Sequence, residues 1–101
     1  MREFLRGAVR LHILHHASIG EVHGAWMATE LAEHGYRISP GSLYPTLHRM
    51  EADGLLRSVH QVVDGRARRS YRATAEGRRV LESTREQLRE LAREVLGDES
   101  R

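Results

Sequence analysis

The sequence contains no cysteine, which excludes a disulfide framework and any thiolate metal site. It also contains no lysine, so all 16 of its positively charged residues are arginines. No apolar run approaches the ~18–20 residues that a membrane-spanning helix needs. Residues 1–7 lack the apolar segment of a signal peptide. These absences predict a cytoplasmic protein with no membrane contact.

Positive charge is concentrated in the middle of the chain. From Arg37 to Arg72 there are seven arginines and three acidic residues, a local net charge of +4. Residues 74–101 carry six arginines and seven acidic residues. A basic segment beside a balanced one indicates a phosphate-facing surface and a second surface with another role.

Apolar spacing predicts helices over residues 4–17 and 23–34, and a third helix that ends at Gly54. In the third helix Leu43, Leu47 and Met50 follow the i, i+4, i+7 rule and should be buried. Pro45 leaves two possible starts. Capping by Ser42 puts Pro45 where its missing N–H costs nothing, whereas capping by Ser39 puts it inside the helix. We favour the first, with a loose turn over residues 39–41.

A β-hairpin follows, with strands predicted over residues 55–63 and 66–73. The Asp64-Gly65 pair between them is a strong hairpin signal, because a tight primed turn needs positive φ. The last helix should run from residue 74 to 96, with Thr74 as its cap and Gly97 as its stop.

Apolar residues in the last helix repeat at seven-residue intervals. Leu81, Leu88 and Val95 have this spacing, and Leu91 lies between them. Such a seam is typical of helices that pair with a second helix. We therefore predict a homodimer held by Leu81, Leu88, Leu91 and Val95.

The order of elements predicts a mainly α (α+β) fold, a winged helix-turn-helix with a C-terminal dimerisation helix. Residues 1–73 would form the DNA-binding domain, residues 74–97 the dimerisation helix, and residues 98–101 a disordered tail. In this fold the third helix reads the major groove, and the hairpin is a wing that contacts backbone or minor groove. The candidate DNA-binding residues are Ser39, Ser42, Tyr44, Thr46, His48, Arg49, Arg66, Arg68 and Arg69.

Interpretations that involve no DNA binding remain open for these residues. The polar positions of the third helix could be an ordinary solvated surface. The hairpin arginines could serve to keep an exposed strand edge from aggregating. The basic hairpin beside the third helix favours DNA contact.

The first helix carries three histidines, of which His12 and His16 are four apart and share a face. These histidines have three possible interpretations. They could be ordinary packed or exposed side chains, they could line a polar effector pocket with Trp26, or they could bind a metal or haem. No carboxylate or third histidine follows at helical spacing, and two ligands rarely suffice. We therefore predict no metal and no cofactor. For Trp26 we favour a filler of the core or of an interface over a platform on which a ligand stacks.

Several stretches match one family along nearly the whole chain. They are Leu5-Arg6-Gly7, Val22-His23-Gly24, Ser39-Pro40-Gly41-Ser42-Leu43-Tyr44-Pro45-Thr46-Leu47-His48-Arg49-Met50-Glu51, Asp53-Gly54-Leu55-Leu56, Gly65-Arg66-Ala67-Arg68-Arg69-Ser70-Tyr71-Arg72 and Thr74-Ala75-Glu76-Gly77. With these motifs the chain resembles the PadR family of bacterial transcriptional regulators, in its compact subclass with one C-terminal helix.

The resemblance implies a two-fold dimer that represses its own gene and nearby efflux or detoxification genes. It also implies release from DNA when a small aromatic or cationic effector binds near the dimer interface. Three positions depart from the family pattern. Ala25 stands where an aromatic residue is usual, Ala67 where proline is usual, and Ser70 where lysine or tyrosine is usual. These departures leave the operator sequence and the effector open.

The sequence shows no nucleophile elbow, P-loop, metal quartet or paired-carboxylate setting, and we predict that the protein is not an enzyme. The favoured function is a sequence-specific, ligand-responsive, dimeric repressor that binds palindromic double-stranded DNA. The alternative is a winged-helix protein–protein interaction module or a metal- or haem-responsive sensor.

Overall fold

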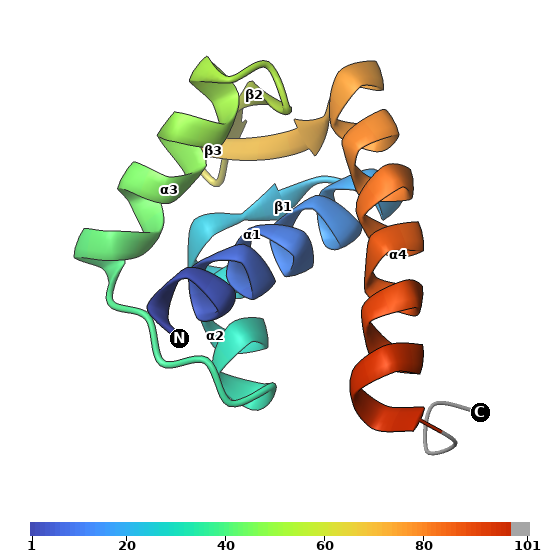
Figure 1. Ribbon diagram of the computed structural model, residues 1–101. Coiled ribbons are helices and arrows are strands. Elements are labelled where there is room, and N and C mark those ends of the chain that lie inside the picture. The colour runs from blue at the N-terminus through green and yellow to red at the C-terminus, as the bar shows by residue number, and fades with distance from the viewer. Residues whose placement is uncertain (98–101) are drawn as a thin grey trace.

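The computed structural model describes residues 1–97, and the predicted tail over residues 98–101 lies outside the described residues. The helices and strands follow one another in the predicted order, with one additional short strand (Figure 1). The elements are α1 (Arg2–Ile19), β1 (Val22–His23), α2 (Gly24–Glu33), α3 (Pro40–Ala52), β2 (Leu56–Val63), β3 (Arg66–Ala73) and α4 (Ala75–Leu96). This arrangement is the predicted α+β winged helix with a long C-terminal helix.

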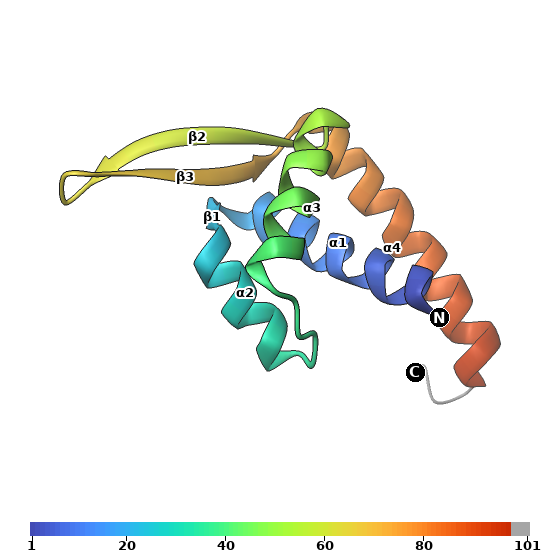
Figure 2. The same cartoon turned by 90° about the vertical axis from the view of Figure 1, so that its left-hand side faces the viewer.

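The sheet has three antiparallel strands in the order β1-β3-β2. The hairpin pairs Val63 with Arg66 at its tip and Leu56 with Ala73 at its base. Asp64 (φ 53°) and Gly65 (φ 76°) both adopt positive φ, as the predicted primed turn requires. Figure 2 shows the hairpin projecting well beyond the helices, which is the geometry of a wing.

The predicted start of α3 was wrong. Ser39 is the N-cap in extended conformation, Pro40 occupies the first turn, and Pro45 lies inside the helix. Pro40 costs nothing at this position, because the first N–H groups of a helix have no intrahelical partner. The backbone N–H groups of Ser42 and Leu43 both donate to the Ser39 carbonyl, at 3.0 and 2.8 Å, and close the first turn. Pro45 removes a single hydrogen bond from an otherwise regular helix.

A single core joins the three N-terminal helices to the sheet. The predicted stripe of Leu43, Leu47 and Met50 is confirmed, since all three side chains are buried. Other fully buried side chains in this core are Ile13, Met27, Leu31, Leu56 and Tyr71. The inner face of α3 is therefore fixed, and its remaining faces point outward.

The start of α4 is bonded to the residues that connect α3 to β2. Thr74 caps α4 by accepting a hydrogen bond from the Gly77 N–H at 2.9 Å. The Thr74 hydroxyl donates to the Gly54 carbonyl, and the Thr74 N–H donates to the Leu55 carbonyl at 3.1 Å. Gly77 packs so closely on Leu55 that a Cβ would lie 2.2 Å from its carbonyl oxygen. We call these contacts the α4 junction.

Beyond the junction α4 runs beside α1, on the side of the molecule away from α3 (Figure 1). The Arg78 guanidinium donates to the Ser18 carbonyl at 3.0 Å, and the Arg85 guanidinium donates to Nδ1 of His15 at 3.0 Å. Leu81 is only 3 % exposed and lies in the core of its own chain. It therefore has almost no surface left for a second chain and drops out of the predicted dimer seam. The seam is reduced to residues further along α4.

The second half of α4 presents uncovered apolar side chains. Leu88, Leu91 and Val95 are 46 %, 47 % and 68 % exposed. Phe4 and Leu5 of α1 are also exposed. Among the described residues no helix is long and apolar enough to cross a membrane.

Candidate nucleic-acid interface

The outward faces of α3 carry the predicted DNA-binding residues. Ser39, Ser42, Tyr44, His48 and Arg49 are exposed, and Thr46 is half-buried. The Thr46 hydroxyl donates to the Ser42 carbonyl at 2.9 Å, one turn earlier. The buried stripe on the opposite face fixes which side of α3 turns outward, which is what a reading helix requires.

Tyr44 lies across the start of α2. A Cβ on Gly24 would be 2.5 Å from Tyr44 Cε1 and 2.8 Å from its hydroxyl oxygen. The absence of a side chain at Gly24 therefore creates the space that the Tyr44 ring occupies. Gly24 belongs to the site as a positioning residue, which the sequence did not indicate.

The wing and α3 are linked by Arg69. Its guanidinium donates to Nε2 of His48 on α3 and to Nε2 of His60 on β2, each at 3.4 Å. Arg66 and Arg68, nearer the tip, are exposed. A cleft of about 720 Å³ separates Tyr44 from the wing and is lined by all three arginines. The structure thus brings His48 and Tyr44 of α3 together with the basic side of the hairpin.

Two acidic residues fix the base of the wing. Glu51 accepts hydrogen bonds from the Ser58 hydroxyl at 2.6 Å and from the Ser58 N–H at 3.1 Å, which ties the end of α3 to β2. The hydrogen bond from the Ser58 side chain lowers the pKa of the Glu51 carboxyl. Glu21 accepts from Gln61 at 2.9 Å and from Ser70 at 3.3 Å. Sequence reasoning missed both, because these pairs join residues that show no shared local pattern.

The three residues predicted for an effector pocket meet in one ring cluster. His12 and His16 have ring centroids 6.5 Å apart, and His16 meets Trp26 edge-on at 5.2 Å. His12 also stacks on His34, which the sequence did not single out, at 5.1 Å. Nε2 atoms of His16 and His34 lie 3.4 and 3.2 Å from Oε1 of Glu30.

The ring cluster is a surface feature rather than a closed cavity. Trp26 is 46 % exposed. Burial and the neighbouring histidines lower the pKa of the His12 imidazole. Within residues 1–97, no set of three or more His, Cys, Asp or Glu side chains is arranged to hold a metal ion.

The chain has clear relatives among known proteins. The profile of the "Transcriptional regulator PadR-like family" matches residues 13–83. Transcriptional regulator Rv3488 of Mycobacterium tuberculosis (strain ATCC 25618 / H37Rv) is 70 % identical over 100 residues, which cover 99 % of this chain and 94 % of the relative.

Two solved structures share the architecture. A PadR family transcriptional regulator from Eggerthella lenta DSM 2243 superposes with a TM-score of 0.81 at 33 % identity, covering 92 % of this chain and 82 % of the other. A PadR-like transcriptional regulator from Bacillus cereus strain ATCC 14579 gives 0.83 at 30 % identity, covering 92 % of each chain. The winged-helix prediction and the family resemblance are thereby confirmed, and the protein is a regulator, not an enzyme. The chain belongs to the PadR-like family of transcriptional regulators.

Proposed function

We propose that the protein is a dimeric repressor that binds palindromic double-stranded operator DNA in the cytoplasm. The observation that carries this proposal is the exposed polar face of α3 beside an arginine-tipped hairpin. Its targets would be its own gene and genes for efflux or detoxification, as in the family resemblance.

Recognition would proceed through α3 in the major groove. The N-terminal residues of such a helix reach base edges. Ser39, Ser42 and Tyr44 lie there, and hydroxyl groups can bond either bases or phosphates. Thr46 and Arg49 lie one and two helical turns after Ser42, and arginine pairs well with guanine edges.

The wing would hold the backbone or enter a minor groove. Arg66 and Arg68 are exposed near a narrow tip, which suits either contact. Arg69 has a different part, because its bonds to His48 and His60 fix the wing relative to α3.

Dimerisation would place two such surfaces at operator spacing. Two recognition helices must sit about 34 Å apart to meet successive major grooves. Leu88, Leu91 and Val95 form an exposed apolar stripe on α4, which a second copy would cover. A monomer would leave this stripe in water.

An effector would act through the ring cluster of α1 and α2. The exposed Trp26 ring can stack on an aromatic molecule or attract a cation, with Glu30 close by. His15, next to His16, is bonded to Arg85 of α4. A molecule bound at His12, His16 and Trp26 would therefore shift α4 and change the separation of the two recognition helices.

A salt titration of DNA affinity tests the proposal. The probe is the fluorescently labelled inverted repeat upstream of the protein's own gene, with a scrambled duplex as control. Affinity should fall with salt, with a log–log slope of about −0.9 for each neutralised phosphate. Arg68→Ala should weaken binding to both duplexes, whereas Thr46→Ala and Arg49→Ala should reduce the preference for the repeat.

Two results would contradict the proposal. Wild-type protein that binds the repeat no better than the scrambled duplex would remove sequence recognition. Unchanged affinity in all three variants would show that the surface is wrong, and would favour the winged-helix module that binds another protein.

A further inference from the structure

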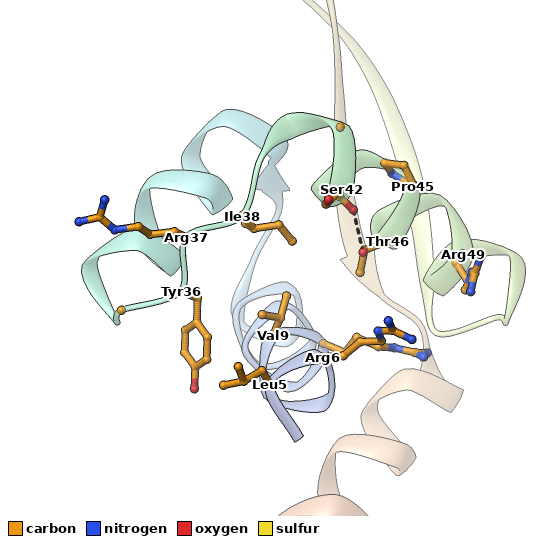
Figure 3. A pocket seen from close by; sticks show the side chains of 13 residues that line it. Leu5, Arg6, Val9, Tyr36, Arg37, Ile38, Ser42, Pro45, Thr46 and Arg49 are labelled. Carbon is orange, nitrogen blue, oxygen red and sulfur yellow. Dashed lines mark hydrogen bonds between the residues drawn. The ribbon is translucent and has the colours of Figure 1, made fainter. Parts of the chain in front are cut away.

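A second cleft borders α3 on the side away from the wing. It measures about 720 Å³ and lies between the start of α1, the segment of residues 35–38 and α3 (Figure 3). From α3 it is lined by Ser42, Thr46 and Arg49, which face away from Tyr44. Seen from the α3 face, the hairpin leaves one side of α3 and the start of α1 lies on the other (Figure 2). We call this the α1 cleft.

Arginine dominates the charge of the α1 cleft. Arg6 and Arg10 of α1, Arg37 of the segment before α3 and Arg49 of α3 all line it. Figure 3 shows Arg6 and Arg49 at one end, while Arg37 extends away from the other end. The only carboxylate bonded to any of them within residues 1–97 is Asp53, whose Oδ2 lies 3.5 Å from Nη2 of Arg10.

The guanidinium groups of Arg6 and Arg49 have no hydrogen bond or ion pair in the described part of the chain. With Arg10 they place three guanidinium groups against one carboxylate. Like charges held together repel one another, so an anion in the cleft is favourable. The planar guanidinium fork matches the geometry of a phosphate group.

We propose that the α1 cleft binds a phosphate diester of the DNA backbone through Arg6 and Arg10. This inference rests on the proposed function. A helix in a major groove has one phosphate strand on each side, with the groove about 12 Å wide. The wing and Tyr44 face one strand, and the α1 cleft faces the other. Arg6 and Arg10 thus fix the orientation of α3 without reading sequence.

Asp53 has a defined part in this arrangement. In the free protein the Asp53 carboxylate forms an ion pair with Arg10, and the Asp53 side chain is half exposed. A phosphate must compete with this carboxylate for the guanidinium. Removal of the Asp53 carboxylate should therefore strengthen binding to every duplex.

The experiment measures anisotropy of the labelled repeat and of the scrambled duplex over a range of salt concentrations. At about 0.1 M salt, Arg6→Ala and Arg10→Ala should each lose about fivefold to tenfold in affinity for both duplexes, and lower the salt slope by about 0.9. Arg6→Lys keeps the charge and should keep most of the affinity. Arg79→Ala is the matched control, since Arg79 is exposed on α4 and does not line the cleft.

A methylphosphonate scan locates the contact. Replacement of one charged phosphate at a time should weaken wild-type binding at each contacted position, and at one position in each half of the repeat it should cause no further loss in Arg6→Ala. Asp53→Ala should bind both duplexes more tightly than wild type. Calorimetric titration with inorganic phosphate, without DNA, should show no saturable binding below the millimolar range.

Several outcomes would overturn the inference. If Arg6→Ala and Arg10→Ala bind like wild type while Arg68→Ala binds weakly, the cleft does not hold DNA and the proposed function stands. If Arg68→Ala also binds like wild type, the proposed interface itself is wrong. Equal losses in Arg6→Lys and Arg6→Ala would show a structural role, and tight binding of inorganic phosphate would show a site for a free anion.

Discussion

Gly77→Ala is expected to destabilise the fold through the α4 junction. The added Cβ would lie 2.2 Å from the Leu55 carbonyl oxygen and 3.1 Å from its carbonyl carbon. These are backbone atoms, so no side-chain rotation relieves the contact. The same carbonyl accepts the Thr74 N–H, and moving it breaks that bond.

The size of the effect follows from three opposing contributions. Overpacking of this kind costs about 1–3 kcal/mol. Loss of the Thr74 hydrogen bond adds about 1 kcal/mol. Alanine is a better helix former than glycine, which stabilises the variant by about 1 kcal/mol. The net free energy of unfolding should fall by about 2 kcal/mol, and Tm by about 10 °C for a chain of this size.

Gly7→Ala is the matched control, because Gly7 lies in α1 with nothing within 4 Å of the added Cβ. It should raise the free energy of unfolding by about 0.5–1 kcal/mol. Both variants and wild type are compared by thermal and urea unfolding at one protein concentration, since association shifts apparent stability. Gly77→Ala as stable as wild type would refute the account of the junction.

Three further predictions concern the site and the dimer. In Gly24→Ala the added Cβ meets the end of the Tyr44 ring rather than backbone, so Tm should change by only a few degrees. Affinity for the operator repeat should fall about tenfold in an anisotropy assay, because the Tyr44 ring is displaced. Unchanged affinity would remove Tyr44 from the interface. Glu51→Gln should lose about 1 kcal/mol of stability at pH 7, because the bonds from Ser58 lower the pKa of the carboxyl below its ordinary 4.5. That contribution is present above pH 4.5 and is lost as pH falls through the lowered pKa, so wild type and variant should converge in acid unfolding curves, and a constant gap would contradict it. Leu88→Asp should yield a monomer at micromolar concentration in sedimentation velocity, because it places a charge in the apolar stripe, and a persistent dimer would exclude this face.

Local patterns predicted the elements whose signals are contained in a few neighbouring residues. The stripe of Leu43, Leu47 and Met50 identified the buried face of α3, and Asp64-Gly65 identified the turn of the wing. The cap at Thr74 was equally readable. In each case the residues that make the structure lie within one or two turns of one another.

Long-range contacts were the source of the errors. Strand β1 has only two residues, too short for alternation to show, and exists because Val22 and His23 pair with β3. Leu81 has the spacing of a dimer seam, yet it is buried in the core of its own chain. Periodicity gives the face of a helix but not the neighbour that covers it.

The same limit applies to the candidate site. The histidines of α1 were visible in the sequence, but His34 and Glu30 join them only because α2 packs against α1. Arg6 and Arg10 gave no signal either, since they lie 30 residues or more before α3 in the chain. The positive surface of the protein is therefore larger than the basic middle segment suggested.

Through the α4 junction, α4 should move together with α3 and the wing. Thr74 bonds Gly54 and Leu55, which directly follow α3 and precede the wing. A 22-residue helix is about 33 Å long, so a tilt of about 5° at its far end moves the near end by about 3 Å. A displacement of that size carries α3 and the wing together and takes them out of register with a rigid duplex. If the proposed function holds, a small tilt of the distal half of α4 would be enough to lower the affinity for the operator.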